Sequence, residues 1–293
     1  MIYDKIAGAP ISWGVCEVPN WGHQMSPERV FGEMASIGLK GTEFGPLGFL
    51  PIEPSERAAV LSELDMHATG GFFPVLLHKA DHDPLDSVKV ELESYLASGA
   101  TTLVLAADSG LVGYDEKRPE LTDAEWATVF KNLDAINAYA ESLGVQAVLH
   151  PHVGTIVETP EDIMQIATGS KINFCLDTGH FVVGGADPVD FSAKHPGRVA
   201  HSHLKDVDVA WATKVQNGDV AFYDAVVQGM FRPLGQGDVD IRAIVRNLLT
   251  NGYQGWFVLE QDCVIQSEPA EGEGPLADAK ASVEFLREVI ASI

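Results

Sequence analysis

The chain has 293 residues, of which 46% are apolar, so it can bury a large core, and we expect one domain over residues 1–293. Its net charge of −23, from 42 acidic and 19 basic residues, repels polyanions and argues against a nucleic acid partner. No apolar run approaches the roughly 18 to 20 residues that cross a bilayer, and the amino terminus lacks the layout of a secretion signal. We therefore expect a cytoplasmic protein without a membrane partner.

Short apolar runs alternate with segments of helical period along the whole chain. Strands are predicted over residues 6–13, 41–44, 71–77, 101–107, 145–150, 172–177, 198–204 and 255–260. Helices are predicted over residues 26–37, 55–66, 84–97, 122–143, 159–168, 188–194, 240–249 and 275–290. Repeated strand-then-helix units of this kind predict an α/β fold, a single (β/α)8 TIM barrel.

Residues 206–239 form an insertion after the seventh predicted strand. The segment is too long for an ordinary connection in a compact domain, and it carries aromatic residues such as Trp211 and Phe222. A loop of this length at the functional face of a barrel is either a lid or a subunit contact, and both interpretations stay open.

Four of the predicted strands end on residues that can ligate a metal, namely His150, Asp177, His203 and Glu260. In a parallel barrel the carboxyl ends of the strands share one face, where active sites lie. Imidazole and carboxylate ligands without thiolates suit Mn²⁺, Fe²⁺, Co²⁺ or Zn²⁺. His152 shares a strand face with His150, so either can be the ligand; we favour His150 because it lies closer to the strand.

Several motifs resemble the xylose-isomerase-like barrel superfamily, and within it the inosose dehydratases of myo-inositol catabolism. They include Gly41-Thr42-Glu43, His150-Pro151-His152-Val153-Gly154-Thr155, Leu176-Asp177-Thr178-Gly179-His180, His201-Ser202-His203-Leu204-Lys205-Asp206 and Gly252-Tyr253-Gln254-Gly255-Trp256. The resemblance runs over nearly the whole chain and implies divalent metal ligands at His150, Asp177, His203 and Glu260. Most isomerases and epimerases of this superfamily carry glutamate at the position of His150, so the histidine favours a lyase.

By this resemblance, the expected reaction is the dehydration of a cyclic keto-polyol. A divalent ion would bind the ketone oxygen and stabilise the enediolate that forms when a proton leaves the neighbouring carbon. Candidates for proton transfer are Glu43, His152 (or His150) and Lys205. Candidates for contact with the substrate are Trp13, His78, His180, His201 and Arg232.

Three alternatives remain open. A keto-sugar isomerase or epimerase would use the same metal and enediolate. A barrel deoxyribonuclease would need a basic groove, which the net charge disfavours, and a non-catalytic accessory or binding subunit would not need the intact ligand set. The resemblance implies manganese or cobalt, with zinc, iron and magnesium as other candidates. A requirement for glutathione and assembly into a homo-oligomer are left open.

Overall fold

The computed structural model describes residues 2–111 and 113–293. Parallel strands close into a barrel in the order β1-β10-β7-β6-β5-β4-β3-β2. Their bounds are β1 Ile6–Gly8, β2 Gly41–Glu43, β3 His67–Val75, β4 Thr102–Ala107, β5 Gln146–Leu149, β6 Asn173–Asp177, β7 Val199–Leu204 and β10 Phe257–Leu259. Neighbours in the barrel follow chain order, which confirms the predicted (β/α)8 barrel.

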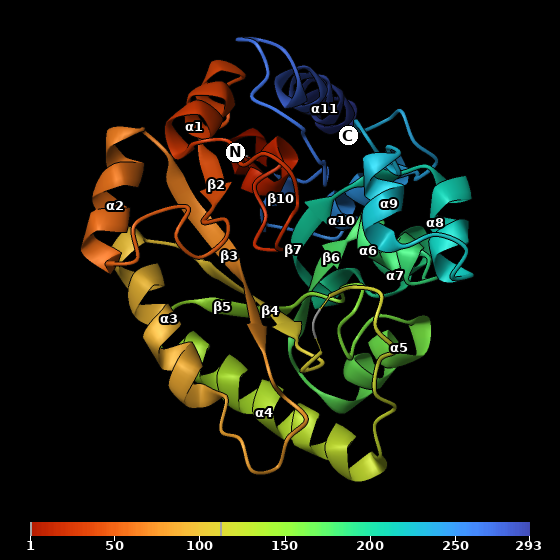
Figure 1. Cartoon of the computed structure of the whole chain (residues 1–293). Helices are drawn as coiled ribbons and strands as arrows, with labels where there is room; N and C mark the ends of the chain where they lie inside the picture. Colours follow the sequence, from red (N-terminus) through yellow and green to blue (C-terminus); the bar gives the residue numbers. More distant parts are fainter. Residues whose placement is uncertain (1, 112) are drawn as a thin grey trace.

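Helices surround this barrel (Figure 1). They are α1 Pro27–Ser36, α2 Pro54–Glu63, α3 Leu85–Ser98, α4 Asp123–Ser142, α5 Pro160–Gly169, α6 Thr178–Val183, α7 Pro188–Lys194, α10 Ile241–Thr250 and α11 Pro275–Ala291. Side-chain caps mark two of the helix starts, since Ser26 caps α1, and Thr122 and Glu125 make a capping box at α4. Several helices therefore begin where their sequence specifies.

Apolar side chains fill the inner part of the barrel, and polar ones stand above them. Val104, Val148 and Cys175 form one buried cluster, and Val258 belongs to another with Ala7. Because side chains on one face of a strand recur every second residue, the positions two residues beyond Val148, Cys175 and Val258 face the same interior. The polar residues of the site therefore lie directly above a layer of apolar side chains inside the barrel.

Two predicted strands differ from the structure. The first was expected over residues 6–13, but β1 ends at Gly8 and Pro10–Trp13 forms a 3₁₀ helix, because Pro10 has no N–H to continue the ladder. The third was expected over residues 71–77, but β3 starts at His67, where it pairs with Gly41 of β2. Pairing with a neighbour extended that strand beyond its apolar run.

The insertion after β7 is folded. It contains β8 Asp206–Val207 and β9 Phe231–Arg232, which pair antiparallel, with α8 Val209–Gln216 and α9 Phe222–Val227 between them. In Figure 1 these two helices lie beside α6, a short helix that directly follows β6. That the insertion moves as a lid stays a prediction.

None of the described helices is long and apolar enough to cross a membrane.

Candidate functional site

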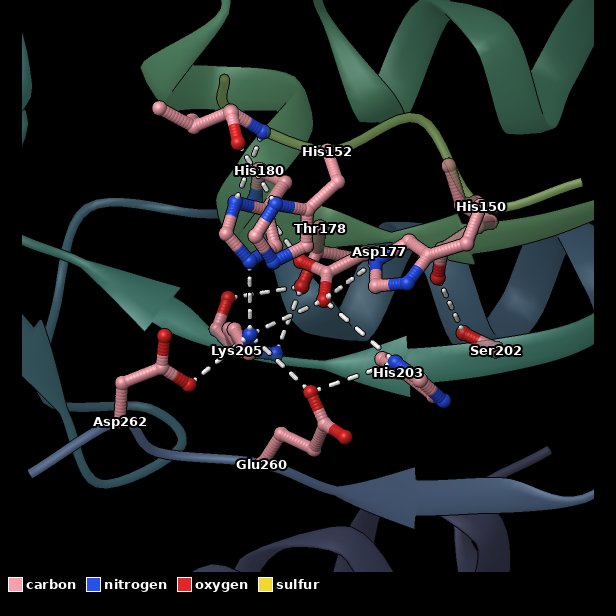
Figure 2. A network of polar contacts seen from close by, with 12 residues as sticks. His150, His152, Asp177, Thr178, His180, Ser202, His203, Lys205, Glu260 and Asp262 are labelled. Carbon is pink, nitrogen blue, oxygen red and sulfur yellow. Dashed lines mark hydrogen bonds and ion pairs between the residues drawn. The ribbon is translucent and has the colours of Figure 1, made fainter. Parts of the chain in front are cut away.

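The side chains at the ends of β5, β6, β7 and β10 meet at the carboxyl end of the barrel (Figure 2). His150 Nε2 lies 3.2 Å from Asp177 Oδ2. His203 Nδ1 lies 3.6 Å from the same Asp177 oxygen and 3.2 Å from Glu260 Oε2. The four residues that the strand ends offered as metal ligands therefore surround one point, and all four are buried.

Glu43, at the end of β2, orients the two histidines of β7. Its Oε1 lies 3.0 Å from His201 Nε2 and 2.9 Å from His203 Nε2. Burial alone would raise the pKa of the Glu43 carboxyl, but His203 and His201 more than offset this and hold the pKa below its usual range. Because an ionised carboxylate only accepts hydrogen bonds, both rings donate Nε2–H to it, and the Nδ1 of His203 is left to face Asp177 and Glu260.

Lys205 reaches into the same cluster, as Figure 2 shows. Its Nζ lies 3.2 Å from Asp177 Oδ2, 3.0 Å from Glu260 Oε2 and 2.9 Å from Asp262 Oδ1. Burial lowers the pKa of the Lys205 ammonium, but Asp177, Asp262 and Glu260 together raise it well above the ordinary value. The same carboxylates therefore favour positive charge at this end of the barrel.

The donors of the cluster fit a divalent cation. His150, Asp177 and His203 offer ligand atoms that lie within 4.8 Å of one another. His203 Nδ1 is buried and makes no hydrogen bond, although Glu260 Oε2 is only 3.2 Å away. Burial lowers the pKa of His203, but Cys175, Glu260 and Glu43 raise it well above its ordinary value, so a proton holds Nδ1 beside the carboxylates. A divalent cation bound by His150, Asp177 and His203 would take the place of that proton. The second group of possible ligands, Glu43 with the two β7 histidines, is already satisfied by hydrogen bonds.

His152 and His180 form a pair beside the cluster. Their ring centroids are 3.7 Å apart, with 34° between the planes. His152 Nδ1 lies 2.7 Å from the Val153 carbonyl oxygen and donates to it, which leaves Nε2 unprotonated. Burial lowers the pKa of His152 to about 3, with a smaller contribution from His150. The ring is therefore neutral, and it presents a free nitrogen.

A cavity of about 450 Å³ opens over these residues, a size within the range of small-molecule sites. The residues of the cluster that line it are Glu43, His150, His152, His203, Lys205, Glu260 and Asp262. Much of the remaining wall is aromatic, from Trp21 in the loop after β1, Phe72 on β3 and Tyr114 in the loop after β4. The cavity thus has a polar floor and a partly aromatic wall.

Three residues expected to contact the substrate do not line this cavity. Trp13 belongs to the 3₁₀ helix that replaced the end of the first strand, and its indole N–H donates to Glu33 Oε2 at 2.8 Å. Arg232, on β9, lies 3.2 Å from Asp208 Oδ2. His78 is buried beyond the end of β3. The positions of Trp13, Arg232 and His78 therefore do not support the expected contacts.

His180 and His201 adjoin the cluster without lining the cavity. His180 Nε2 lies 3.0 Å from Lys205 Nζ, and the His180 backbone N–H donates to Asp177 Oδ1 at 2.8 Å. His201 lies on β7 two residues before His203 and contacts Glu43. Both histidines therefore support residues of the site.

Asp262, Trp21, Tyr114 and Arg57 line the cavity although they were not among the residues predicted for the site. Asp262 follows Glu260 by two residues, and this spacing could have placed both carboxylates on the same side of the chain. Burial raises the pKa of Asp262 to about 6, with Lys205 opposing the rise. The other three lie in loops or on an outer helix, where sequence spacing does not tell which direction a side chain takes.

Comparison with known proteins agrees with this fold. A family model described as xylose isomerase-like TIM barrel matches residues 31–289. The rhizopine catabolism protein MocC of Rhizobium meliloti is 32% identical over 297 residues, which cover 98% of this chain and 89% of that protein. An inosose dehydratase of Geobacillus kaustophilus is 30% identical, over 98% of this chain and 94% of that protein.

Solved structures show the same fold at lower identity. The IolI protein with a bound zinc atom superposes with a TM-score of 0.70 at 13% identity, covering 98% of both chains. The structure of an L-ribulose 3-epimerase gives a TM-score of 0.69 at 15% identity, covering 98% of this chain and 94% of that one.

Proposed function

Because this chain belongs to the xylose isomerase-like TIM barrel family, we propose that it is a divalent-metal-dependent lyase that dehydrates a cyclic keto-polyol of the inosose type. The observation that carries the proposal is the convergence of His150, Asp177, His203 and Glu260 beneath a cavity of small-molecule size. Relatives named inosose dehydratase, matched over nearly their whole length, support the reaction type.

The same four residues would hold the ion. Two carboxylates and two imidazoles suit Mn²⁺ or Co²⁺, which we propose as the working metals, and Zn²⁺, Fe²⁺ or Mg²⁺ are tested beside them. When bound, the ion supplies Lewis-acid stabilisation of the negative charge that develops on the substrate oxygen atoms. Glu43 fixes the ring of His203 for this task, so we assign Glu43 a positioning role in place of proton transfer.

His152 and Lys205 would carry the proton transfers. The free Nε2 of His152 takes the proton from the carbon beside the ketone. The Lys205 ammonium, held on the cavity floor by Glu260 and Asp262, donates a proton to the hydroxyl that leaves as water. The proton gained by His152 then passes to Lys205, directly or by exchange with solvent that gives one proton back to Lys205, so the elimination releases one water and leaves both residues as they began.

The test is turnover of scyllo-inosose and a panel of keto-sugars by metal-loaded protein. We expect a conjugated dione absorbance to grow with scyllo-inosose, together with solvent exchange of the proton beside the ketone in deuterated water. Exchange without dione would move the assignment to an isomerase or epimerase. Neither exchange nor dione with any substrate, and no bound metal, would favour the accessory subunit, an interpretation that the enzyme relatives do not support.

His152→Gln tests the proton transfer separately from the metal. We expect the catalytic rate to fall by roughly 10² or more, the range for losing a general base, because glutamine keeps the size of the side chain but has no basic nitrogen. The metal content should remain that of the wild type, since His152 Nδ1 contacts the Val153 carbonyl rather than the cluster. Wild-type proton exchange in this variant would contradict the role of His152 as the base.

A further inference from the structure

The cavity continues beyond the mouth of the barrel. On β2 Glu43 contacts histidines of the barrel interior, whereas the next residue, Phe44, contacts Tyr95 of the outer helix α3. On β3 Phe72 contacts His150, and the next residue, Phe73, points to the opposite side of the strand. Members of both pairs line the same cavity.

The cavity therefore has an outer lobe between β2 and β3 on one side and α2 and α3 on the other. We define this outer lobe by the lining residues Phe44, Leu50, Arg57, Phe73 and Glu91. The volume of about 450 Å³ lies in the range of roughly 300–1,000 Å³ for sites of drug-sized ligands, which are larger than one polyol ring. A ring bound over the metal cluster would leave the outer lobe for another part of the ligand.

Arg57 provides the donors in the outer lobe. It is buried, with 6% of its surface exposed, and its guanidinium lies 4.8 Å from the centre of the Phe44 ring. Among the described residues, the guanidinium makes one hydrogen bond, from Nε to the Pro51 carbonyl at 2.9 Å. Its Nη1 lies 3.8 Å from Glu91 Oε1, beyond hydrogen-bond distance. A buried arginine normally uses most of its N–H groups in hydrogen bonds. The Nη groups of Arg57 have only the 3.8 Å ion pair with Glu91, so they remain available to donate to a ligand.

Glu91 supplies the acceptor and determines the charge of the ligand. With Arg57 it makes an almost neutral pair, and the carboxylate would repel a phosphate or carboxylate group placed between the two. Hydroxyl groups both donate and accept, so adjacent hydroxyls can bridge the 3.8 Å between guanidinium and carboxylate. The face of Phe73, which is half-buried, suits the apolar face of a sugar ring.

We propose that the outer lobe is a subsite for a neutral glycosyl substituent, bound between Arg57 and Glu91. This inference rests on the proposed function and narrows it: the preferred substrate is a glycosylated cyclic keto-polyol, with its ketone ring over the metal cluster. Arg57 and Glu91 contact the substituent and determine specificity, and they take no part in the elimination.

The test is equilibrium binding by calorimetry to metal-loaded protein, with two probes that lack a ketone and cannot react, myo-inositol and a galactosyl-myo-inositol. We expect the wild type to bind the galactosyl probe at least tenfold more tightly. Arg57→Met and Glu91→Leu should reduce that preference to below threefold without changing the affinity for myo-inositol. Glu93→Leu, which removes an exposed carboxylate from the same helix, is the matched control and should keep the full preference.

Equal binding of both probes by the wild type, no binding of the galactosyl probe, or an unchanged preference in Glu91→Leu would overturn the subsite. If Arg57→Met fails to fold because the contact with Pro51 is lost, Glu91→Leu decides alone. The binding test does not depend on turnover. A glycosyl preference in a protein that forms no dione from any inosose would leave the subsite standing and reject the dehydratase.

Discussion

Asp177 has two tasks at the end of β6, and a single substitution separates them. Its Oδ2 faces His203 and Lys205 at the proposed metal site, and its Oδ1 accepts the His180 backbone N–H and caps α6. Asp177→Asn keeps an oxygen for the cap and removes the negative charge. We expect bound metal per chain to fall at least tenfold and activity to be lost, with the circular dichroism of the barrel unchanged.

Metal content is measured by mass spectrometry after equilibration with MnCl₂. Asp187→Asn is the matched control, because Asp187 also caps a helix, α7, but is exposed and distant from the cluster. Wild-type metal content in Asp177→Asn would remove Asp177 from the ligand set.

We expect the burial of Glu91 in the outer lobe to lower the stability of the fold in a pH-dependent way. Burial raises its pKa above 4.5, with Arg57 opposing the rise. An acid with a raised folded-state pKa destabilises the fold above that pKa, and the cost disappears once the pH falls below the unfolded value of 4.5. We expect Glu91→Gln to melt at a higher temperature than the wild type at pH 7.5, with the difference vanishing by about pH 4.

Thermal melts from about pH 4 to 8 measure this difference. Glu93→Gln, on the exposed face of the same helix, should show no such change with pH. If the wild type is instead more stable than Glu91→Gln at pH 7.5, the pair of Glu91 with Arg57 stabilises the fold, and ionised Glu91 does not destabilise it.

At the scale of elements, Asp206 holds the two ends of the insertion together next to β7. Its carboxylate accepts backbone N–H groups of Val207 at 2.9 Å, Gly235 at 2.8 Å, Gly237 at 3.0 Å and Val239 at 3.0 Å. The first and last residues of the segment are thus held by one buried side chain. The two helices between them bury Ala212 and Phe222 in one core cluster with Val183 of α6, and that they move as a lid stays a prediction.

Asp206→Asn should therefore loosen the insertion. The amide has only one acceptor oxygen, and each Asp206 oxygen accepts two of the four bonds, so two hydrogen bonds to a charged group are lost, at a cost of about 3 kcal/mol or more. We expect a lower melting temperature and faster proteolysis within residues 208–231. Asp238→Asn is the control, because Asp238 is exposed and accepts a single bond from Val209. Equal rates of proteolysis in Asp206→Asn and Asp238→Asn would show that other contacts hold the segment.

At the scale of the whole molecule, bound metal should stabilise the fold. The proposed ligands stand at the ends of β5, β6, β7 and β10, so the ion would bind the folded chain and not the unfolded one. A hundredfold excess of free metal over its Kd contributes about 2.7 kcal/mol. For a chain of this size we expect the melting temperature of chelator-treated protein to rise by roughly 5 °C on adding MnCl₂. The same rise in Asp177→Asn would mean that the metal stabilises another site.

The sequence by itself determined the barrel and the floor of its site. Alternating apolar runs and helix starts specified the strand-then-helix units, and the period of two placed His150, Asp177, His203 and Glu260 on one inward face. These signals are local, because each depends on a few consecutive residues whose backbone geometry is fixed. Pro10 was a local signal for the early end of β1 as well, but the predicted strand over residues 6–13 ran through it.

Only the tertiary structure decided what each polar group pairs with. Glu43 and His201 are 158 residues apart and share a hydrogen bond, and Lys205 points to Asp262. Trp13 turned away from the cavity, whereas Arg57, on an outer helix, came to line it. Such partnerships depend on how the barrel closes and on how loops and helices pack around it, because spacing along the chain fixes the face of a strand but not the partner across space.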